Sequence, residues 1–326
     1  MNIHIRRPVE YEKIIANQDP RNIELTRHRM IVQQLLDSKE NVDTLQSRLQ
    51  DYIRCFDNMT RTLDPAQKLQ KQPNFHWVID SKTIQSSCWK FEAILPRIVL
   101  SDILQNKARA LIEKADYVPA SKLLEEAITS HLQVVRLLNT WKWKLPSANH
   151  PILQKQWNVS MIHHLKSMKN LCMLSVGLQK EMNVTALYKV AQRATAAAVQ
   201  SIAFWPNKPS TLKLCESMQH LFSSHILWNR SQYGASIERL QTWIGHDTID
   251  TFGFATLQNE LVNVPFLIQE RTQVNNGAYF DPIQPASPLP TPHELIHTGS
   301  TDASHPPSTR NTPMEHAPDE PHAPEQ

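Results

Sequence analysis

The stretch LKLCESMQHLFSSHILWNRSQYGASIERLQTW, residues 212–243, carries the pattern that decides the fold class. Apolar residues recur in it at helical spacing on both sides of the pair Tyr233-Gly234. Gly234 is expected at the C-cap of the first helix, because glycine adopts the left-handed conformation without steric cost. The stretch therefore predicts two antiparallel helices joined by a short turn. The residues expected to face inward are Leu214, Met218, Leu221, His225 and Trp228 from the first helix, and Ile237, Leu240 and Ile244 from the second.

The same periodicity extends over most of the chain, so a mostly all-α fold built from successive helical hairpins is expected. Such hairpins resemble a tetratricopeptide-like solenoid, although no strict period is present. The further helices are expected at residues 42–59, 82–114, 121–143, 152–181, 187–204 and 254–274, with a short helix within residues 1–30. Pro96 is expected to kink or split the second of these. Residues 254–274 should be interrupted near Pro265, and Leu124, Ile128, Leu132, Val135 and Leu138 should form the buried stripe of residues 121–143.

Two local patterns depart from ordinary amphipathic helices. FHWVID, residues 75–80, has the aromatic and β-branched content of a strand and is expected to be a short edge strand. Residues 187–204 carry a stripe of small residues that permits close approach of two helices, namely Ala191, Ala194 and Ala198, ending with Ile202.

VNNGAYFDPIQPASPLPTPHELIHTG, residues 274–299, marks the end of the helical body. Asn275-Asn276-Gly277 predicts a helix stop, and the prolines that follow favour an extended strip. The strip either packs on the body through Ile283, Leu289, Leu295 and Ile296 or is a plain linker. The expected domains are residues 1–299, including a Pro-rich strip at 281–299, and a disordered acidic tail at 300–326.

Composition excludes several classes of protein. Six glycines form no phosphate-binding loop, and four cysteines contain no C-x-x-C pair, so they indicate buried thiols in a reducing, cytoplasmic setting. No catalytic motif is present, which indicates a protein that is not an enzyme and needs no cofactor. The histidines of the helical body (His131, His150, His163 and His164) lack metal-site spacing, and those of the tail suggest only weak affinity for metals.

The charges are divided unevenly along the chain. From residue 281 onward there is one arginine against seven acidic residues, so the helical body is basic. Such a body suits acidic protein helices or an anionic membrane surface, whereas a plain solvated surface is the simpler interpretation. The eight tryptophans are expected mainly in packing rather than in binding of nucleic acid.

The order of several motifs resembles the Bro-domain family, and within it the fungal members that act in the pH response. The resemblance runs from about residue 37 to residue 299 and is carried by TLQSRLQDYIRCF (44–56), FHWVIDS (75–81), YKVAQRATAAAVQSI (188–202), YGASIERLQTWIG (233–245) and the strip at 274–299. It implies a curved helical solenoid with a tetratricopeptide-like core and a small N-terminal β element.

The resemblance also implies a function, that of a non-catalytic adaptor. Such proteins bind the C-terminal helix of an ESCRT-III subunit in a hydrophobic groove. The pH-response members assemble with other components of ambient (alkaline) pH signalling and promote proteolytic activation of a transcription factor. The protein would then be cytoplasmic and recruited to the plasma membrane cortex or to endosomes. The alternative is an adaptor of endosomal sorting without a role in pH sensing.

The counterpart of the family's groove helix is residues 160–174, within a segment that has more apolar residues than one buried face needs. Leu165-Lys166-Ser167-Met168 is bulkier than the small-residue pattern of the family. Each candidate apolar residue can equally be plain core. The candidates for partner binding are Trp157, Met161, Ile162, Leu165 and Met168, with Lys166 and Lys169 at the rim.

Overall fold

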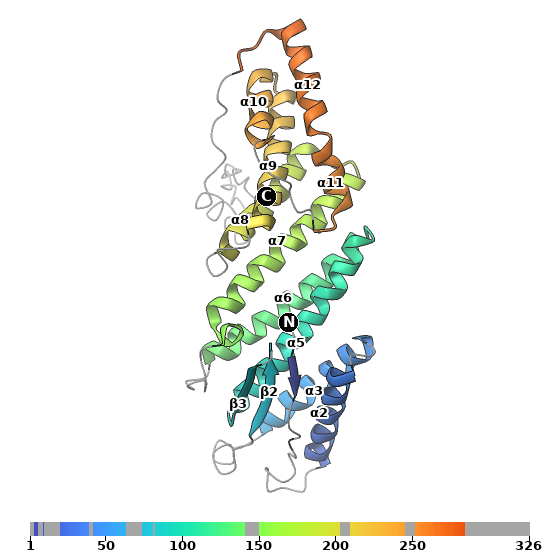
Figure 1. Cartoon of the computed structure of the whole chain (residues 1–326), viewed down its shortest axis with the longest axis vertical. Helices are drawn as coiled ribbons and strands as arrows, with labels where there is room; N and C mark the ends of the chain where they lie inside the picture. The colour runs from blue at the N-terminus through green and yellow to red at the C-terminus, as the bar shows by residue number, and fades with distance from the viewer. Residues whose placement is uncertain are drawn as a thin grey trace, which may run out of the picture.

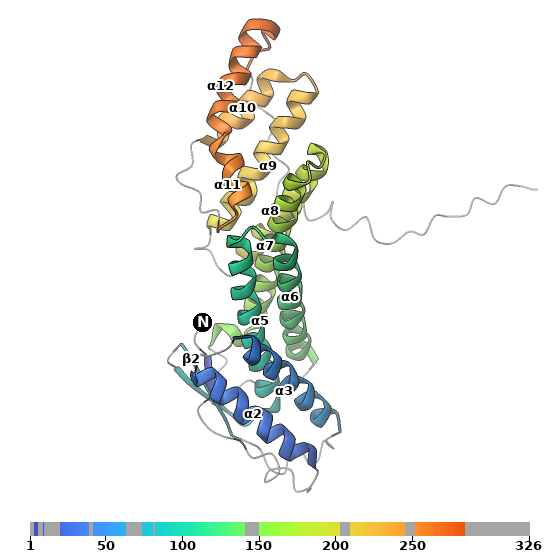
Figure 2. The same cartoon turned by 90° about the vertical axis from the view of Figure 1, so that its right-hand side faces the viewer.

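The computed structural model describes residues 3–5, 9, 20–38, 42–62, 74–80, 82–140, 150–202, 209–244 and 252–283. Its helices pack mainly against their neighbours in the sequence and form an elongated solenoid with a small sheet at one end (Figures 1 and 2). The helices are α2 (Pro20–Ser38), α3 (Val42–Thr62), α5 (Trp89–Glu113), α6 (Tyr117–Thr140), α7 (Lys155–Gln179), α8 (Val184–Ile202), α9 (Pro209–Asn229), α10 (Tyr233–Ile244), α11 (Ala255–Val262) and α12 (Val264–Val274). The mostly helical solenoid with an N-terminal β element is thus confirmed.

The sheet lies beside α2 and α3 and has three antiparallel strands in the order β1-β2-β3 (Figure 1). They are β1 (Ile3–Ile5), β2 (Phe75–Ile79) and β3 (Lys82–Ser86). β2 is the central strand and is buried throughout, so the prediction of an edge strand at 75–80 was wrong. The predicted helix at 82–114 begins only at Trp89, because its first residues pair with β2 instead.

Pro96 lies inside α5, which continues past it for 17 residues as a single helix. Of the two outcomes expected at Pro96, a kink or a split, the split was therefore wrong. Proline removes one backbone hydrogen bond, but almost every residue from Trp89 to Leu104 is buried, and this packing holds the helix together. The short helix expected within residues 1–30 is the start of α2, which runs on to Ser38.

Three hairpin turns of the solenoid share one backbone geometry, in which a residue other than glycine takes the left-handed conformation. Ala115, Glu181 and Ser231 have φ values of 60°, 52° and 60°. In each turn the following residue donates its N–H to a carbonyl five positions earlier, as Asp116 does to Leu111. Ser231, and not Gly234, therefore ends α9, and the predicted C-cap glycine lies instead in the first turn of α10.

Two hydrophobic clusters fill the interior, and α5 contributes to both. The first joins the sheet, α2, α3 and the first half of α5, and the second joins the second half of α5 to α6–α12. Ala191, Ala194 and Ala198 are buried in the second cluster, which confirms the small-residue stripe. In α6 the predicted stripe was wrong at Leu132, which is 40% exposed, while His131 and Val134 are buried.

The C-terminal part of the body agrees with the predicted break, since α11 and α12 are separated by Asn263. The predicted stop at residues 275–277 agrees with the end of α12 at Val274, but one π-helical turn (Asn275–Tyr279) follows, and the left-handed conformation is taken by Phe280. Of the Pro-rich strip, only residues 281–283 are described. The anchors Leu289, Leu295 and Ile296 and the tail at 300–326 lie outside the described residues.

The first residues of the strip are bound to the body. Asn275 donates from Nδ2 to the carbonyl of Asp281 at 2.8 Å, and Asp281 accepts the backbone N–H of Gly234 at 2.8 Å. A Cβ atom at position 234 would overlap the carbonyl oxygen of Pro282. Glycine is therefore required at position 234 for close approach, not for a left-handed turn.

Candidate functional site

The candidate partner-binding residues all lie on or beside α7, between α6 and α8 in the middle of the solenoid (Figure 1). Trp157, Ile162 and Leu165 are 7%, 5% and 1% exposed and belong to the hydrophobic clusters. A side chain that is buried in this way presents no surface to a partner. Ile162 and Leu165 therefore act as core residues in this conformation.

Met161 and Met168 remain half-buried and share one face of α7, because they are seven residues apart. Met161 packs against both clusters and Met168 against the second. Half-buried His164 lies between them on the same face. Methionine side chains are flexible and adapt to different apolar partners, and of the five apolar candidates these two are the ones that are not buried.

The two lysines lie elsewhere on α7. Lys166 is exposed and points away from both methionines, since at about 100° per residue it lies about 140° around the helix from Met161 and about 160° from Met168. Lys169 pairs with Glu125 of α6, with 2.7 Å between Nζ and Oε2. The structure therefore does not bring the two lysines together with the two methionines as one rim.

A second open surface lies over α5, between α3 and α6, and sequence reasoning did not find it. It is a groove of about 840 Å³ with an apolar floor formed by Ile53, Leu100 and Leu104. Charged side chains of both signs line its edges, among them Arg54, Arg61, Lys122, Glu125 and Glu126. An apolar floor with a polar rim suits one face of an amphipathic helix.

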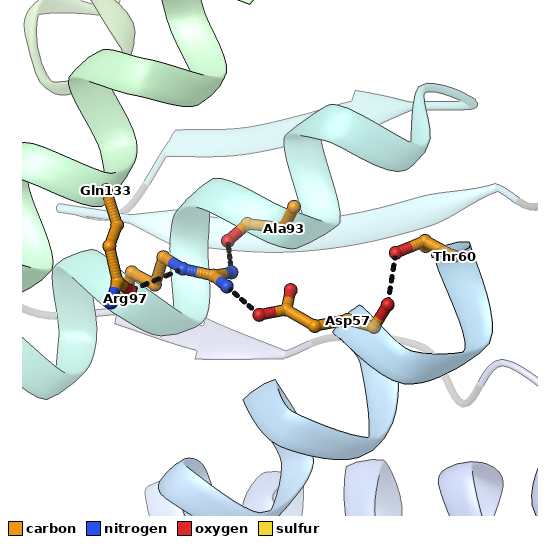
Figure 3. A network of polar contacts seen from close by, with 5 residues as sticks. All are labelled: Asp57, Thr60, Ala93, Arg97 and Gln133. Atoms are coloured by element: carbon orange, nitrogen blue, oxygen red, sulfur yellow. Dashed lines mark hydrogen bonds and ion pairs between the residues drawn. The ribbon is translucent and has the colours of Figure 1, made fainter. Parts of the chain in front are cut away.

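Arg97 bonds to two residues that line this groove, and Figure 3 shows its polar contacts. Its guanidinium donates to Asp57 of α3 at 2.5 Å, to the carbonyl of Ala93 at 2.6 Å and to Gln133 of α6 at 3.1 Å. Asp57 and Gln133 both line the groove. The spacing of α3 and α6 is thus set by a buried arginine that bonds to both helices.

Buried ionisable groups in the described residues are used for structure. Glu92 is fully buried and accepts hydrogen bonds from Arg29 at 2.8 Å, Tyr52 at 2.6 Å and Trp77 at 2.7 Å. These partners come from α2, α3 and β2, so one carboxylate joins three elements to α5. Because Glu92 is fully buried together with these three partners, its carboxylate is held in the core.

His131 is a second buried group with a structural role. Its Nδ1 lies 2.9 Å from Oδ1 of Asn158. The amide nitrogen Nδ2 of Asn158 donates to the carbonyls of Ile152 and Gln154. Burial lowers the pKa of His131 to about 4, while the hydrogen bond to Asn158 opposes that change. The imidazole is therefore neutral at pH 7.

One group of possible metal ligands occurs among the described residues, and sequence reasoning missed it. It consists of Glu24, His28 and Cys55, whose ligand atoms lie within 4.8 Å of one another. The available signal was the i, i+4 spacing of Glu24 and His28 on one helix face. Burial, followed by the charge of Glu24, raises the pKa of the Cys55 thiol, which argues against a catalytic nucleophile.

Among the described residues, no helix combines the length and the apolar content that crossing a membrane requires.

Comparisons with known proteins give a likeness of structure without a likeness of sequence. The sequence matches no protein-family model and none of the curated proteins searched. A crystal structure of ALIX in complex with the SIVmac239 PYKEVTEDL late domain is similar with a TM-score of 0.73 and 11% identity. The match covers 89% of this chain and 46% of that one, so the chain spans about half the length of that ALIX structure.

Two further structures correspond over most of their own length. The ALIX BRO1 domain in complex with CHMP4C has a TM-score of 0.68 and 10% identity, with 90% of this chain and 96% of that one covered. A structure that gives the basis for endosomal targeting by the Bro1 domain has a TM-score of 0.66 and 11% identity. The match covers 90% of this chain and 88% of that one. The order of helices, the N-terminal sheet and these three likenesses together show that the chain has the fold of a Bro domain.

Proposed function

We propose that the protein is a non-catalytic adaptor that binds the C-terminal amphipathic helix of an ESCRT-III subunit. The observation that carries this proposal is the Bro-domain fold over 90% of the chain, since a neighbour of that fold was solved with CHMP4C. The use of the buried ionisable residues Glu92 and His131 for structural hydrogen bonds also supports an adaptor.

We propose the face of α7 with Met161 and Met168 as the docking site, with buried Trp157 supporting it from the core. A partner helix would place apolar residues at i, i+3, i+4 and i+7 against these side chains. Lys169, and Lys166 on the far side of α7, would contribute a positive potential that attracts an acidic partner rather than direct contacts. Ile162 and Leu165 would support the site from the core.

The test is calorimetric titration of the full-length protein with a synthetic peptide of the C-terminal helix of CHMP4C. Met161→Asp and Met168→Asp should each weaken binding by about tenfold or more, because each places a charge on an apolar contact. Lys166→Ala, on the opposite face of the same helix, is the matched control and should change the affinity by about threefold or less. Circular dichroism of each variant verifies that the helices are intact.

The groove over α5 supplies the discriminating variant. Ile53→Asp changes its floor and leaves α7 untouched. If Ile53→Asp abolishes binding while the methionine variants retain it, the site on α7 is wrong and the partner lies between α3 and α6. An absence of saturable binding by the folded wild-type protein contradicts the adaptor proposal itself.

We further propose that the adaptor acts in ambient-pH signalling, as the resemblance to the fungal regulator PalC implies. It would be recruited to the plasma membrane cortex or to endosomes with other members of that pathway and promote proteolytic activation of a pH-responsive transcription factor. The alternative is an adaptor for endosomal sorting alone. The Bro1 domain associated with endosomal targeting supports that alternative to the same degree.

The two roles are separated by complementation of a fungal strain that lacks PalC. Restored cleavage of the transcription factor after a shift to alkaline medium supports the signalling role, provided that Met168→Asp fails to restore it. The alternative is tested in a second strain, which lacks its sorting Bro-domain protein. It is supported if the protein restores delivery of membrane cargo to the vacuole in that strain but does not restore cleavage of the transcription factor in the first strain.

A further inference from the structure

Helices α2 and α3 lie side by side at the end of the solenoid that carries the sheet (Figure 2). The buried face of α2 is formed by Leu25, Arg29, Val32 and Leu36 with two polar residues. Glu24 and His28 lie on its flank, where Glu24 is exposed and His28 is half-buried. Cys55 of α3 faces this flank and is also half-buried.

Small rotations of the three side chains would bring their ligand atoms to the separations found around one metal ion. Oε1 of Glu24 and Nε2 of His28 are 3.5 Å apart, and all three ligand atoms lie within 4.8 Å of one another. Ligands at 2.0–2.3 Å from a tetrahedral Zn²⁺ are separated by about 3.4–3.6 Å. The Glu24–His28 pair already has this separation, and the thiol of Cys55 lies within 4.8 Å of both ligand atoms, so it has to move inward by no more than about 1.4 Å.

The same distance is long for a direct hydrogen bond, for which N–H···O separations of about 2.7–3.2 Å are usual. Nδ1 of His28 is buried without a hydrogen-bond partner. Nε2, the other ring nitrogen, faces the carboxylate of Glu24, so it is the nitrogen that can bind a cation held between the two side chains.

The kind of donor atoms indicates which ion fits. A thiolate, an imidazole and a carboxylate together match the ligands of Zn²⁺, and the charges of Cys55 and Glu24 balance those of a divalent ion. Three protein ligands leave a fourth position for water. Of the four cysteines of the chain, Cys55 alone is half-buried and the other three are buried, so it is the thiol that an ion can reach.

We propose that Glu24, His28 and Cys55 form a zinc site that fastens α2 to α3. Two ligands come from α2 and one from α3, so binding stabilises the packing of the N-terminal helix against the rest of the solenoid. The site lies apart from α7 and does not depend on the proposed binding of an ESCRT-III helix.

Cobalt substitution tests the proposal, because Co²⁺ replaces Zn²⁺ and gives a charge-transfer absorption only when a thiolate binds it. Full-length protein freed of metal should bind one equivalent of Co²⁺ with this absorption, and Zn²⁺ should displace it. The histidines of the tail cannot produce the signal, since they offer no sulfur. Cys55→Ala should abolish the absorption, and His28→Gln and Glu24→Gln should each weaken binding by at least about tenfold.

His163→Gln is the matched control, because His163 is a half-buried histidine on α7 outside the group. This variant should bind Co²⁺ as the wild type does. An absent thiolate band in folded wild-type protein, or a band that persists in Cys55→Ala, would overturn the site.

A second measurement does not depend on spectroscopy. Zn²⁺ should raise the Tm of the wild-type protein, and the rise should be lost in Glu24→Gln, whose exposed side chain is not needed for folding. An equal rise in both proteins would mean that the ion binds elsewhere and would also overturn the proposal.

Discussion

At the scale of single residues, the carboxylate of Glu92 is the centre of a buried hydrogen-bond network. It accepts hydrogen bonds from three elements and pairs with buried Arg29, whose side chain is 1% exposed. Replacing one member of a buried ion pair leaves the other charge without compensation, which costs about 3–5 kcal/mol.

Glu92→Gln should therefore lower the free energy of unfolding by about 3–5 kcal/mol, as measured by urea denaturation. Glu125→Gln is the same substitution in an exposed pair with Lys169 and should cost less than about 1 kcal/mol. Equal losses in the two variants would show that the Glu92 network does not have the energetic role assigned to it.

His131 and His225 should make stability dependent on pH. Burial is the main cause that lowers each pKa to about 4 from the ordinary value of 6.5, and in His225 the charge of Arg271 adds to it. The unfolded chain binds these protons more readily, so the contribution of the two histidines to stability is complete well above pH 6.5 and is lost as the pH drops through 6.5 towards about 4.

Between pH 7.5 and pH 5 each histidine should remove about 2 kcal/mol of stability. The check is urea denaturation of the wild type and of His131→Gln at both pH values. The difference between the two proteins should change by about 2 kcal/mol in favour of the variant as the pH falls. Parallel pH dependences would contradict a neutral buried His131.

At the scale of elements, the solenoid is joined by turns that carry a steric cost. A residue other than glycine in the left-handed conformation loses about 1–2 kcal/mol. Ala115, Glu181 and Ser231 each occupy that conformation directly after a helix.

Ala115→Gly should raise the free energy of unfolding by about 0.5–1 kcal/mol, because relief of strain exceeds the added entropy of the unfolded chain. Ala110→Gly is the same change at an exposed position inside α5 and should lower it by about 1 kcal/mol. Thermal or urea unfolding of the two variants checks the opposite signs, and a loss in both would contradict the strain argument.

Helix α7 shows why helical periodicity alone did not locate a binding surface. A helix packed between two others buries two flanks, so its apolar residues belong to three different environments. Ile162 and Leu165 are core, and Met161 and Met168 are half-buried, although all four are apolar residues of one segment. Aspartate at Ile162 or Leu165 would therefore test folding rather than binding.

At the scale of the whole molecule, the elongated arrangement limits how far a perturbation spreads. In a solenoid each helix contacts mainly its neighbours, so stability is nearly a sum of local terms. The two hydrophobic clusters divide the chain into a part with the sheet and a part with α6–α12, and α5 connects them.

Leu257→Ala, at a fully buried position of α11, should cost about 2–5 kcal/mol and should lower hydrogen-exchange protection in α7, α9, α11 and α12 while the sheet is unchanged. Ile79→Ala in β2 is the mirror control and should lower protection in the sheet and in α2 and α3. Uniform loss along the chain in either variant would mean that both clusters unfold as one cooperative unit.

Sequence alone determined the features that depend on residues near one another in the chain. Helical periodicity gave α3, α9 and α10 to within a few residues, and the alanines of α8 gave its close packing, because side chains three or four positions apart share a helix face. The order of motifs led to the Bro-domain fold, which the solved structures support.

Tertiary structure decided what depends on residues far apart in the chain. Pairing with β1 and β3 made β2 a central strand, and a tight approach of Pro282 explained Gly234 better than any turn did. The meeting of Glu24 and His28 with Cys55 arises from the packing of α2 on α3. Local patterns specify which face of a helix is apolar, but only the placement of other helices decides which part of that face stays open to a partner.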